Sequence, residues 1–229
     1  DVLANTFRNK IIVGEALKHA EEEMKFIEKE NIIPVFFTDQ NYPKRLKQCD
    51  DGPVMLYTKG KMDLNAERII SIVGSRTPTV YGKKICRQLI SDLASYNIFI
   101  VSGLAYGIDI CAHQTSLKNN IPTAAVLGHG LDKIYPSAHS SIANEMLNSG
   151  GLITEFISRT QITPEYFPRR NRIVAGLSDA VIVVEAASRS GAIITANIAN
   201  SYNRDVFAVP GRADDVFSEG CNFLIKSNK

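Results

Sequence analysis

The chain has 229 residues, of which 45% are hydrophobic and 22% are charged, and its formal net charge is +2. These values are typical of a soluble globular protein, and the length allows one good-sized domain, alone or with a small appendage. No apolar run reaches the roughly 18 residues that a membrane span needs, and no signal-peptide pattern opens the chain, so we expect no membrane association.

The cysteines indicate the cellular compartment. Cys49, Cys86, Cys111 and Cys221 form no CxxC pair, and no pair of histidines flanks them at the spacing of a metal site. Because disulfides are rare in the cytoplasm, reduced thiols in a cytoplasmic protein are the simplest interpretation. We therefore expect a cytoplasmic protein without a metal.

The first 67 residues read as an extension of a larger unit. The stretch IIVGEALKHAEEEMKFIEKE places apolar residues from Ile12 to Ile27 at nearly a 3.6-residue period, which predicts a helix. Short apolar runs predict strands at residues 32–37 and 54–57, and DQNYPKRLKQCDDGP between them predicts turns. The chain opens at Asp1 without methionine, so we expect a fragment. We divide it into a truncated N-terminal helical segment (1–31), linking strands (32–67) and the main domain (68–229).

From residue 68 onward, apolar strands alternate with helical stretches. The predicted strands are residues 69–74, 98–103, 123–128, 151–156, 180–186 and 205–211. The predicted helices are residues 81–97, 107–120, 140–149, 164–178, 191–203 and 220–227. The strands are continuous apolar runs, so both faces of their sheet should be covered by helices. The sequence predicts an α/β fold with a mostly parallel sheet and a small N-terminal helical and strand extension.

Small residues mark the ends of four strands. Three predicted strands end in Gly74, Gly103 and Gly128, and Ser190-Gly191 follows a fourth. Parallel sheets bind ligands at the carboxyl ends of their strands, where glycine lets the backbone turn sharply and a ligand approach the amides. The helices that follow point their N-termini at the same edge, which favours an anion.

The positive charge is unevenly placed. Residues 1–67 hold 10 basic and 12 acidic side chains, whereas residues 68–229 hold 16 basic and 12 acidic ones. Ten of those 16 basic side chains are arginine. The guanidinium group binds phosphates and carboxylates through two parallel hydrogen bonds, so the bias favours recognition of such anions.

The arginines fall at informative positions. Arg76 follows a buried strand, while Arg169, Arg170 and Arg172 lie near a helix start, where positive charge opposes the helix dipole unless another anion lies nearby. Phe167 beside them offers a face on which a nucleobase could stack. Structural salt bridges and core packing are the alternatives. An aromatic among arginines, without a sequence-reading helix, favours single-stranded over duplex nucleic acid.

Motifs of nucleotide sites and of catalysis are absent. The chain has no GxGxxG after its first parallel strand, no GxxxxGK[ST], no GxSxG and no HExxH, and no helix-turn-helix, RNA-recognition or zinc-finger pattern. His113, His129 and His139 have no nucleophile in motif context, and Asp109 and Glu185 are isolated carboxylates at the sheet edge. We therefore expect no cofactor and no catalytic residue.

Six stretches together resemble one family. They are YPKRLKQCDDGPVMLYTKG, SIVGSRTPTVYG, VSGLAYGIDICAHQTSL, AVLGHGLDKIYPSAH, YFPRRNRIVAGLSDAVIVVEAASRSGAIITANIA and VFAVPGRADDVFSEGCNFLI. They are similar to the bacterial DNA-processing protein family DprA, or Smf, over roughly residues 42–226. The resemblance implies an extended Rossmann-like fold that binds single-stranded DNA. It also implies a homodimer, not an enzyme, that protects incoming strands during natural transformation and loads the RecA recombinase, displacing or working beside single-strand binding protein.

The resemblance carries the family's motifs onto this chain residue by residue. The motif residues are Gly74, Ser75 and Arg76; Ser102, Gly103, Ala105, Gly107, Ile108 and Asp109; Phe167, Pro168, Arg170, Asn171 and Arg172, with Arg169 beside them; and Ser190, Gly191, Thr195 and Ala196. It implies that Arg76, Arg170 and the glycine-loop amides hold phosphates and that Phe167 stacks on or positions a base. It further implies that Phe223, Leu224 and Ile225 of the last helix contribute to a dimer.

The chain also departs from the family's pattern. Full-length members carry an N-terminal helical module, which looks shortened here, and many carry a C-terminal winged helix, which is absent. The stretch TQITPEYF supplies Glu165 and no lysine, so we expect a thinner basic rim.

Two other interpretations stay open. One is a nucleotide-processing enzyme similar to the cytokinin-activating phosphoribohydrolases, although AASRSGAIITA replaces their PGGxGTxxE loop. The other is a scaffold with a vestigial cleft.

Overall fold

A single mixed sheet forms the centre of the computed structural model, which describes residues 13–227. Its strands are β1 (Ile33–Phe36), β2 (Met55–Gly60), β3 (Ile69–Val73), β4 (Phe99–Ser102), β5 (Thr123–Val126), β6 (Gly151–Thr154), β7 (Ala180–Val183) and β8 (Asp205–Ala208). The helices in this part are α2 (Val13–Lys29), α3 (Lys44–Lys47), α4 (Val80–Leu93), α5 (Ile108–Lys118), α6 (Ser140–Met146), α7 (Tyr166–Leu177), α8 (Gly191–Ser201) and α9 (Glu219–Ser227), with 3-10 turns at Ala94–Tyr96 and Ser137–His139.

The six strands from β3 to β8 are parallel, in the order β6-β5-β4-β3-β7-β8. The chain builds outward from β3 to β6 on one side and then returns to place β7 on the other side of β3. The strand order therefore reverses between β3 and β7. In open α/β sheets, ligands bind outside the carboxyl ends of the strands at such a reversal. The predicted α/β class with a mostly parallel sheet is confirmed.

Residues 32–67 join this sheet. β2 pairs antiparallel with β6, and β1 pairs antiparallel with β2, so both extend the edge beyond β6. The segment between them, predicted as turns, contains the short helix α3, whose Leu46 is buried in the core. That prediction was wrong because KRLK offers only one apolar residue, too few to show a helical period.

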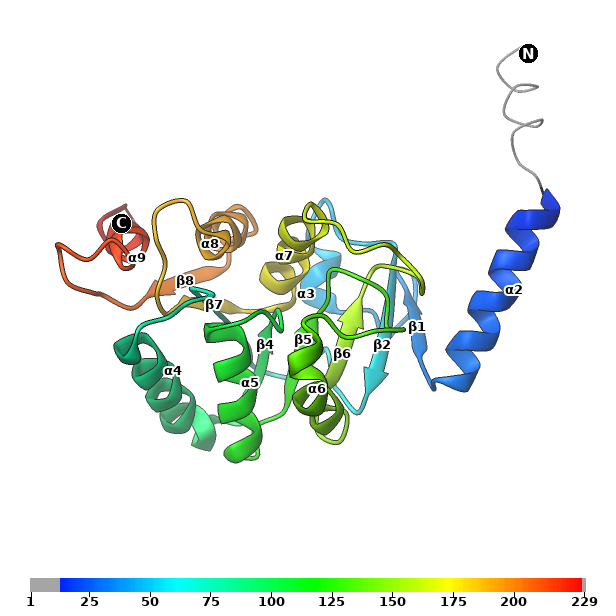
Figure 1. Cartoon of the computed structure of the whole chain (residues 1–229), viewed down its shortest axis with the longest axis horizontal. Coiled ribbons are helices and arrows are strands. Elements are labelled where there is room, and N and C mark those ends of the chain that lie inside the picture. Colours follow the sequence, from blue (N-terminus) through cyan, green and yellow to red (C-terminus); the bar gives the residue numbers. More distant parts are fainter. Residues whose placement is uncertain (1–12, 228–229) are drawn as a thin grey trace, which may run out of the picture.

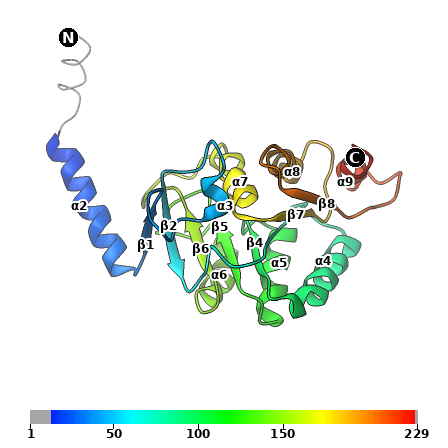
Figure 2. The ribbon, with the colours of Figure 1, turned by 180° about the vertical axis from the view of Figure 1, so that it is seen from behind.

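Helices cover both faces of the sheet, as the continuous apolar strands predicted. α3, α7 and α8 pack on one face, and α4, α5 and α6 pack on the other (Figures 1 and 2). Val174 and Leu177 of α7 lie in the hydrophobic core on the first of these faces. Ile90 of α4 and Ile108 of α5 lie in the hydrophobic core on the other face. Burial of such side chains stabilises the fold by roughly 1.5–3 kcal/mol each.

The terminal helices lie at opposite ends of the sheet, α2 beside β1 and α9 beside β8 (Figure 1). Within the apolar stripe predicted for α2, Ala16, Ala20 and Met24 are exposed and only Ile27 is buried, while Ile12 lies outside the described residues. Glu30, just after α2, forms an ion pair with Lys59 at 2.8 Å. No helix within residues 13–227 is long and apolar enough to cross a membrane.

Candidate nucleic-acid interface

Loops from the carboxyl ends of β3, β4 and β7 meet at the point where the strand order reverses. Ser75 after β3 donates its N–H to the carbonyl of Glu185 after β7 at 2.6 Å. The Ser75 carbonyl in turn accepts from Ile108 N at 3.0 Å, at the start of α5. The first turn of α4 is fixed to the same place, because the Glu185 carboxylate accepts from the amide (3.0 Å) and the hydroxyl (2.6 Å) of Thr79. The β3–α4 loop thus holds one position relative to its neighbours.

Arg76 projects from this loop over an aromatic pair. Its Cζ lies 6.0 Å from the centroid of the Phe167 ring, and the Phe167 ring lies 5.8 Å from that of Tyr135. Arg76 is exposed, and within residues 13–227 it forms no ion pair with a carboxylate. An exposed cation over an aromatic face is favourable by about 0.5–1 kcal/mol and leaves the guanidinium free to bind an anion. Arg76 and the start of α7 therefore lie on the same rim.

Two of the three arginines in α7 share one carboxylate. Arg169 and Arg172 contact the same oxygen of Glu155, at 3.1 and 2.5 Å, from the segment that follows β6. Arg172 also donates to the carbonyl of Asp51. Arg169 is more than half exposed, whereas Arg172 is mostly covered. Glu155 is thus the anion that positive charge at a helix start requires, and it neutralises much of the cluster.

The third arginine, Arg170, lies inside the protein. It is 5% exposed, and its guanidinium donates to the carbonyls of Gly103 (2.6 Å) and Val126, which end β4 and β5. Burial lowers the pKa of Arg170 to about 10, and burial also raises the pKa of its neighbour Asp109, whose charge Arg170 partly offsets. The side chain expected to hold phosphate directly instead joins α7 to two strand ends.

The three glycines at strand ends have a packing role. A side chain on Gly74 would collide with Ile108, one on Gly103 would collide with the Arg170 guanidinium, and one on Gly128 would press on Phe167. At each of these glycines, protein side chains occupy the space into which a side chain would project. Gly107 has a separate reason, because its φ of +86° is unfavourable for other residues and a side chain would strike Ser75 and Arg76.

The predicted site residues divide by exposure. Those with at least partly exposed surface are Gly74, Ser75, Arg76, Gly107, Phe167, Arg169, Asn171, Arg172, Ser190 and Gly191, whereas Ser102, Gly103, Arg170 and Thr195 are buried. The Ser102 hydroxyl donates to the carbonyl of Ile72 at 2.6 Å, and that of Thr195 donates to Gly191 at 3.0 Å. The exposed members form a candidate interface along one edge of the sheet, and the buried members fix its shape.

Comparison with known proteins identifies the family. Residues 34–228 match the sequence profile of the family described as DNA recombination-mediator protein A. The chain belongs to this family, known as DprA or Smf. It is 42% identical over 188 residues to the DNA processing protein DprA of Streptococcus pneumoniae, covering 82% of this chain and 66% of that protein. It is 39% identical over 210 residues to protein Smf of Escherichia coli, covering 91% and 56%.

Solved DprA structures share the fold. The structure of the Streptococcus pneumoniae protein superposes with a TM-score of 0.83 at 40% identity, covering 88% of this chain and 72% of that one. DNA processing protein A of Helicobacter pylori, described as having a unique single-stranded DNA binding mode, gives 0.77 at 31% identity, covering 85% and 87%. The chain spans less than two thirds of the full length of the two curated relatives, and its fold is the extended Rossmann-like DprA fold.

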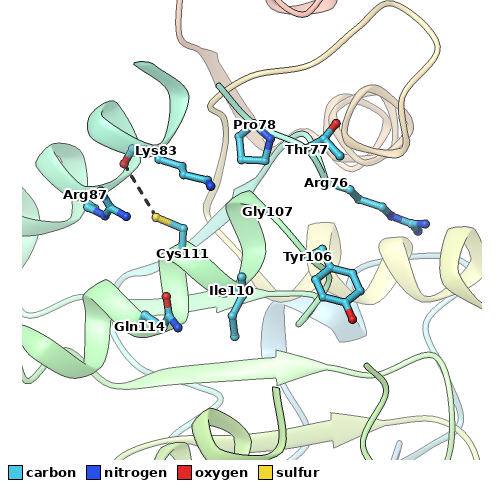
Figure 3. A pocket seen from close by; sticks show the side chains of 10 residues that line it. All are labelled: Arg76, Thr77, Pro78, Lys83, Arg87, Tyr106, Gly107, Ile110, Cys111 and Gln114. Carbon is cyan, nitrogen blue, oxygen red and sulfur yellow. Dashed lines mark hydrogen bonds between the residues drawn. The ribbon is translucent and has the colours of Figure 1, made fainter. Parts of the chain in front are cut away.

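Several exposed residues at this edge of the DprA-family chain were not predicted from the sequence. Tyr135 and Tyr106 each leave about half of their surface exposed, and Tyr106 packs edge-on against His139 with ring centroids 4.8 Å apart. Lys83 and Arg87 on α4 line a cavity together with Arg76 (Figure 3). Their spacing of four residues places them on one helix face and could have drawn attention to them.

The last helix presents two of its three predicted dimer residues. Phe223 and Ile225 of α9 are exposed, at 62% and 47%, whereas Leu224 is buried in the core. Val216 and Phe217, just before α9, are exposed as well. This end of the DprA-family chain thus carries an apolar surface beside the edge strand β8.

Proposed function

We propose that this DprA-family chain binds single-stranded DNA along the edge formed by Arg76, Phe167 and Tyr135. The observation that carries the proposal is the exposed guanidinium of Arg76 over Phe167, whose ring neighbours that of Tyr135, with no carboxylate paired to Arg76 among the described residues. A cation beside partly exposed rings combines a phosphate contact with a stacking surface, the two elements of sequence-tolerant single-strand binding. The single-strand binding described for the Helicobacter pylori protein supports the same ligand.

The proposed role is that of a mediator rather than an enzyme. The strand bound at this edge is protected during natural transformation and passed to a RecA-type recombinase, with single-strand binding protein displaced or retained nearby, in the cytoplasm. The family's description as a recombination mediator supports this role. The Glu185 carboxylate, a candidate general base in the enzyme alternative, is 2% exposed and engaged by Thr79. Turnover of a nucleoside monophosphate that is lost in Glu185→Gln would favour the enzyme instead.

The direct test is a gel shift of single-stranded and duplex oligonucleotides at two salt concentrations. We expect tighter binding to the single strand, and binding that weakens steeply as salt rises, because each phosphate contact releases counterions. Equal affinity for both substrates, or no binding at low salt, would contradict the proposal.

Removing the Arg76 charge should weaken binding to every single-stranded sequence. We expect Arg76→Ala to lower affinity about tenfold and to reduce the slope of log K against log salt by about 0.7, the value for one phosphate contact on a single strand. Fluorescence anisotropy across a salt series measures both quantities. The matched control is Arg68→Ala. Arg68 is exposed and lies just before β3, at the end of the strand opposite to Arg76, so the affinity and slope of this variant should stay at the wild-type values. Equal effects of the two substitutions would place the ligand elsewhere.

The apolar surface at α9 supports the proposed homodimer. We expect Phe223→Glu to convert a dimer to a monomer in analytical ultracentrifugation while the unfolding midpoint stays near wild type, because the side chain is 62% exposed. Leu224→Glu should instead destabilise each subunit by several kcal/mol, since it buries an unpaired charge in the core. A wild-type monomer at high concentration, or a Phe223→Glu dimer, would rule out this interface.

A further inference from the structure

A hollow lined by basic residues opens beside the proposed binding edge. It lies between α4 and α5, has a volume of about 440 Å³ and is lined by residues of the β3–α4 loop, α4, the β4–α5 loop and α5 (Figure 3). Arg76, Lys83 and Arg87 contribute three positive charges, and Tyr106 contributes an aromatic ring. A hollow of this size accommodates a ligand of nucleotide dimensions.

The three cations have no protein counter-charge. None of them forms an ion pair within residues 13–227, and no Asp or Glu is among the described residues that line the hollow. Lys83 and Arg87 are four residues apart on α4, where like charges repel by about 0.2–0.5 kcal/mol. Positive charges gathered without a carboxylate favour the approach of an anion.

The hollow is continuous with the Phe167 edge. Arg76 lines the hollow, and its guanidinium lies over Phe167, so the same residue borders both surfaces. Lys83 and Arg87 are separated by about 6 Å along the helix axis, comparable with the spacing of neighbouring phosphates on an extended strand. An extended polyanion held at Arg76 therefore meets further positive charge in the direction of α4.

The lining favours a strand over a detached nucleotide. Sites that hold a free dinucleotide use a carboxylate to bind the ribose hydroxyls, and the described lining contains none. It offers cations for phosphates, the half-exposed ring of Tyr106 for a base, and Ile110 as an apolar wall. These groups would contact any nucleotide of a strand regardless of its base.

We propose that the hollow between α4 and α5 is a second subsite for single-stranded DNA, in which Lys83 and Arg87 bind the phosphates of a nucleotide adjoining the one at Arg76 and Tyr106 stacks on its base. The subsite rests on the proposed single-strand binding. It defines a path for the bound strand from Phe167 over Arg76 to α4.

The double variant Lys83→Ala/Arg87→Ala tests the subsite. With oligonucleotides of about 4–16 nucleotides, we expect wild-type affinity to rise with length and the double variant to lose much of that gain. Its salt slope should fall by about 1.4, twice the contribution of one phosphate contact. Both side chains are exposed, so the variant should unfold at the wild-type midpoint. The matched control is Lys84→Ala, on the same helix but outside the hollow, whose slope should stay near wild type.

Cys111 supplies an independent readout, because its thiol lines the hollow. The neighbouring Cys86 thiol and the charge of Arg87 both lower the pKa of Cys111, which favours its reaction with an alkylating agent. Of the four cysteines, all buried, it is the one that lines this hollow. We expect iodoacetamide to modify Cys111 first, as seen by peptide mass spectrometry, and an oligonucleotide to protect it.

The outcomes separate the two proposals. If the wild-type protein binds no single strand, the proposed function fails. If it binds, and the double variant keeps the wild-type slope at every length while Cys111 stays unprotected, only the subsite fails. Protection of Cys111 by dTMP or inorganic phosphate as strong as that by the oligonucleotide would overturn the assignment to a strand and indicate a free-anion site.

Discussion

Replacing Arg170 with methionine is expected to lower the free energy of unfolding by about 3–5 kcal/mol, because it leaves buried partners without their charge. The carbonyls of Gly103 and Val126 would lose their donor, and Asp109 would lose the neighbouring positive charge. Urea titration followed by circular dichroism measures the change. Arg170→Lys should recover only part of the loss, since an ammonium cannot reproduce the planar fork that reaches both strand ends.

The neighbouring Arg169 is the matched control. It is on the same helix turn but more than half exposed, and its ion pair with Glu155 is shared with Arg172, so Arg169→Met should change stability by less than about 1 kcal/mol. An Arg170→Met protein with wild-type stability and no single-strand binding would show that this guanidinium contacts the ligand directly, contrary to its buried place here.

Acidification is expected to destabilise the fold through His113. Burial lowers the pKa of His113 from 6.5 to about 3, its Nδ1 lies 2.7 Å from the hydroxyl of Thr123, and its Nε2 has no partner. Between these two pKa values the unfolded chain binds a proton that the folded protein does not, so stability falls as pH drops from 6.5 toward 3. Each pH unit in that window removes up to about 1.4 kcal/mol, which gives about 2 kcal/mol at pH 5.

The contribution of His113 is isolated by substitution. Burial also lowers the pKa of His129, which acts in the same direction, while the raised pKa of Asp109 acts in the opposite one. We therefore compare urea unfolding at pH 7 and pH 5 for wild type, His113→Asn, whose amide can still meet Thr123, and His19→Asn on the exposed face of α2. The stability difference between the two pH values should shrink in His113→Asn only. An undiminished difference would show that His113 is protonated in the folded protein.

Much of the fold was predictable because its parallel strands are buried on both faces. Runs such as IISIVG and IFIVSG are apolar throughout and end in glycine, and the strands begin and end within a few residues of the predicted limits. The antiparallel attachment of β1 was not predictable. Only Val35 of β1 is buried, so the strand has no hydrophobic pattern from which its neighbour in the sheet could be predicted.

The placement of the arginines was predictable, but the exposure and contacts of each side chain were not. The arginines were expected at one edge, and they lie there. Sequence alone could not distinguish exposed Arg76 from buried Arg170. A guanidinium that donates to backbone carbonyls and one that is free to bind a phosphate belong to the same residue type. The need for an anion near α7 was anticipated from the helix dipole, but Glu155 could be found only once β6 and α7 were placed side by side.

The reversal of strand order between β3 and β7 affects which shape of ligand can bind there. Where the strand order reverses, the connections that leave the two strands usually diverge and form a crevice in which a free cofactor binds. Here Glu185 joins the β3–α4 loop to the segment after β7, because its carbonyl accepts from the Ser75 amide and its carboxylate accepts from Thr79. We therefore expect a ligand at this point to lie across the joined loops. A short ligand there would leave most of its surface in water. An extended chain of any length could lie across the loops with both of its ends free.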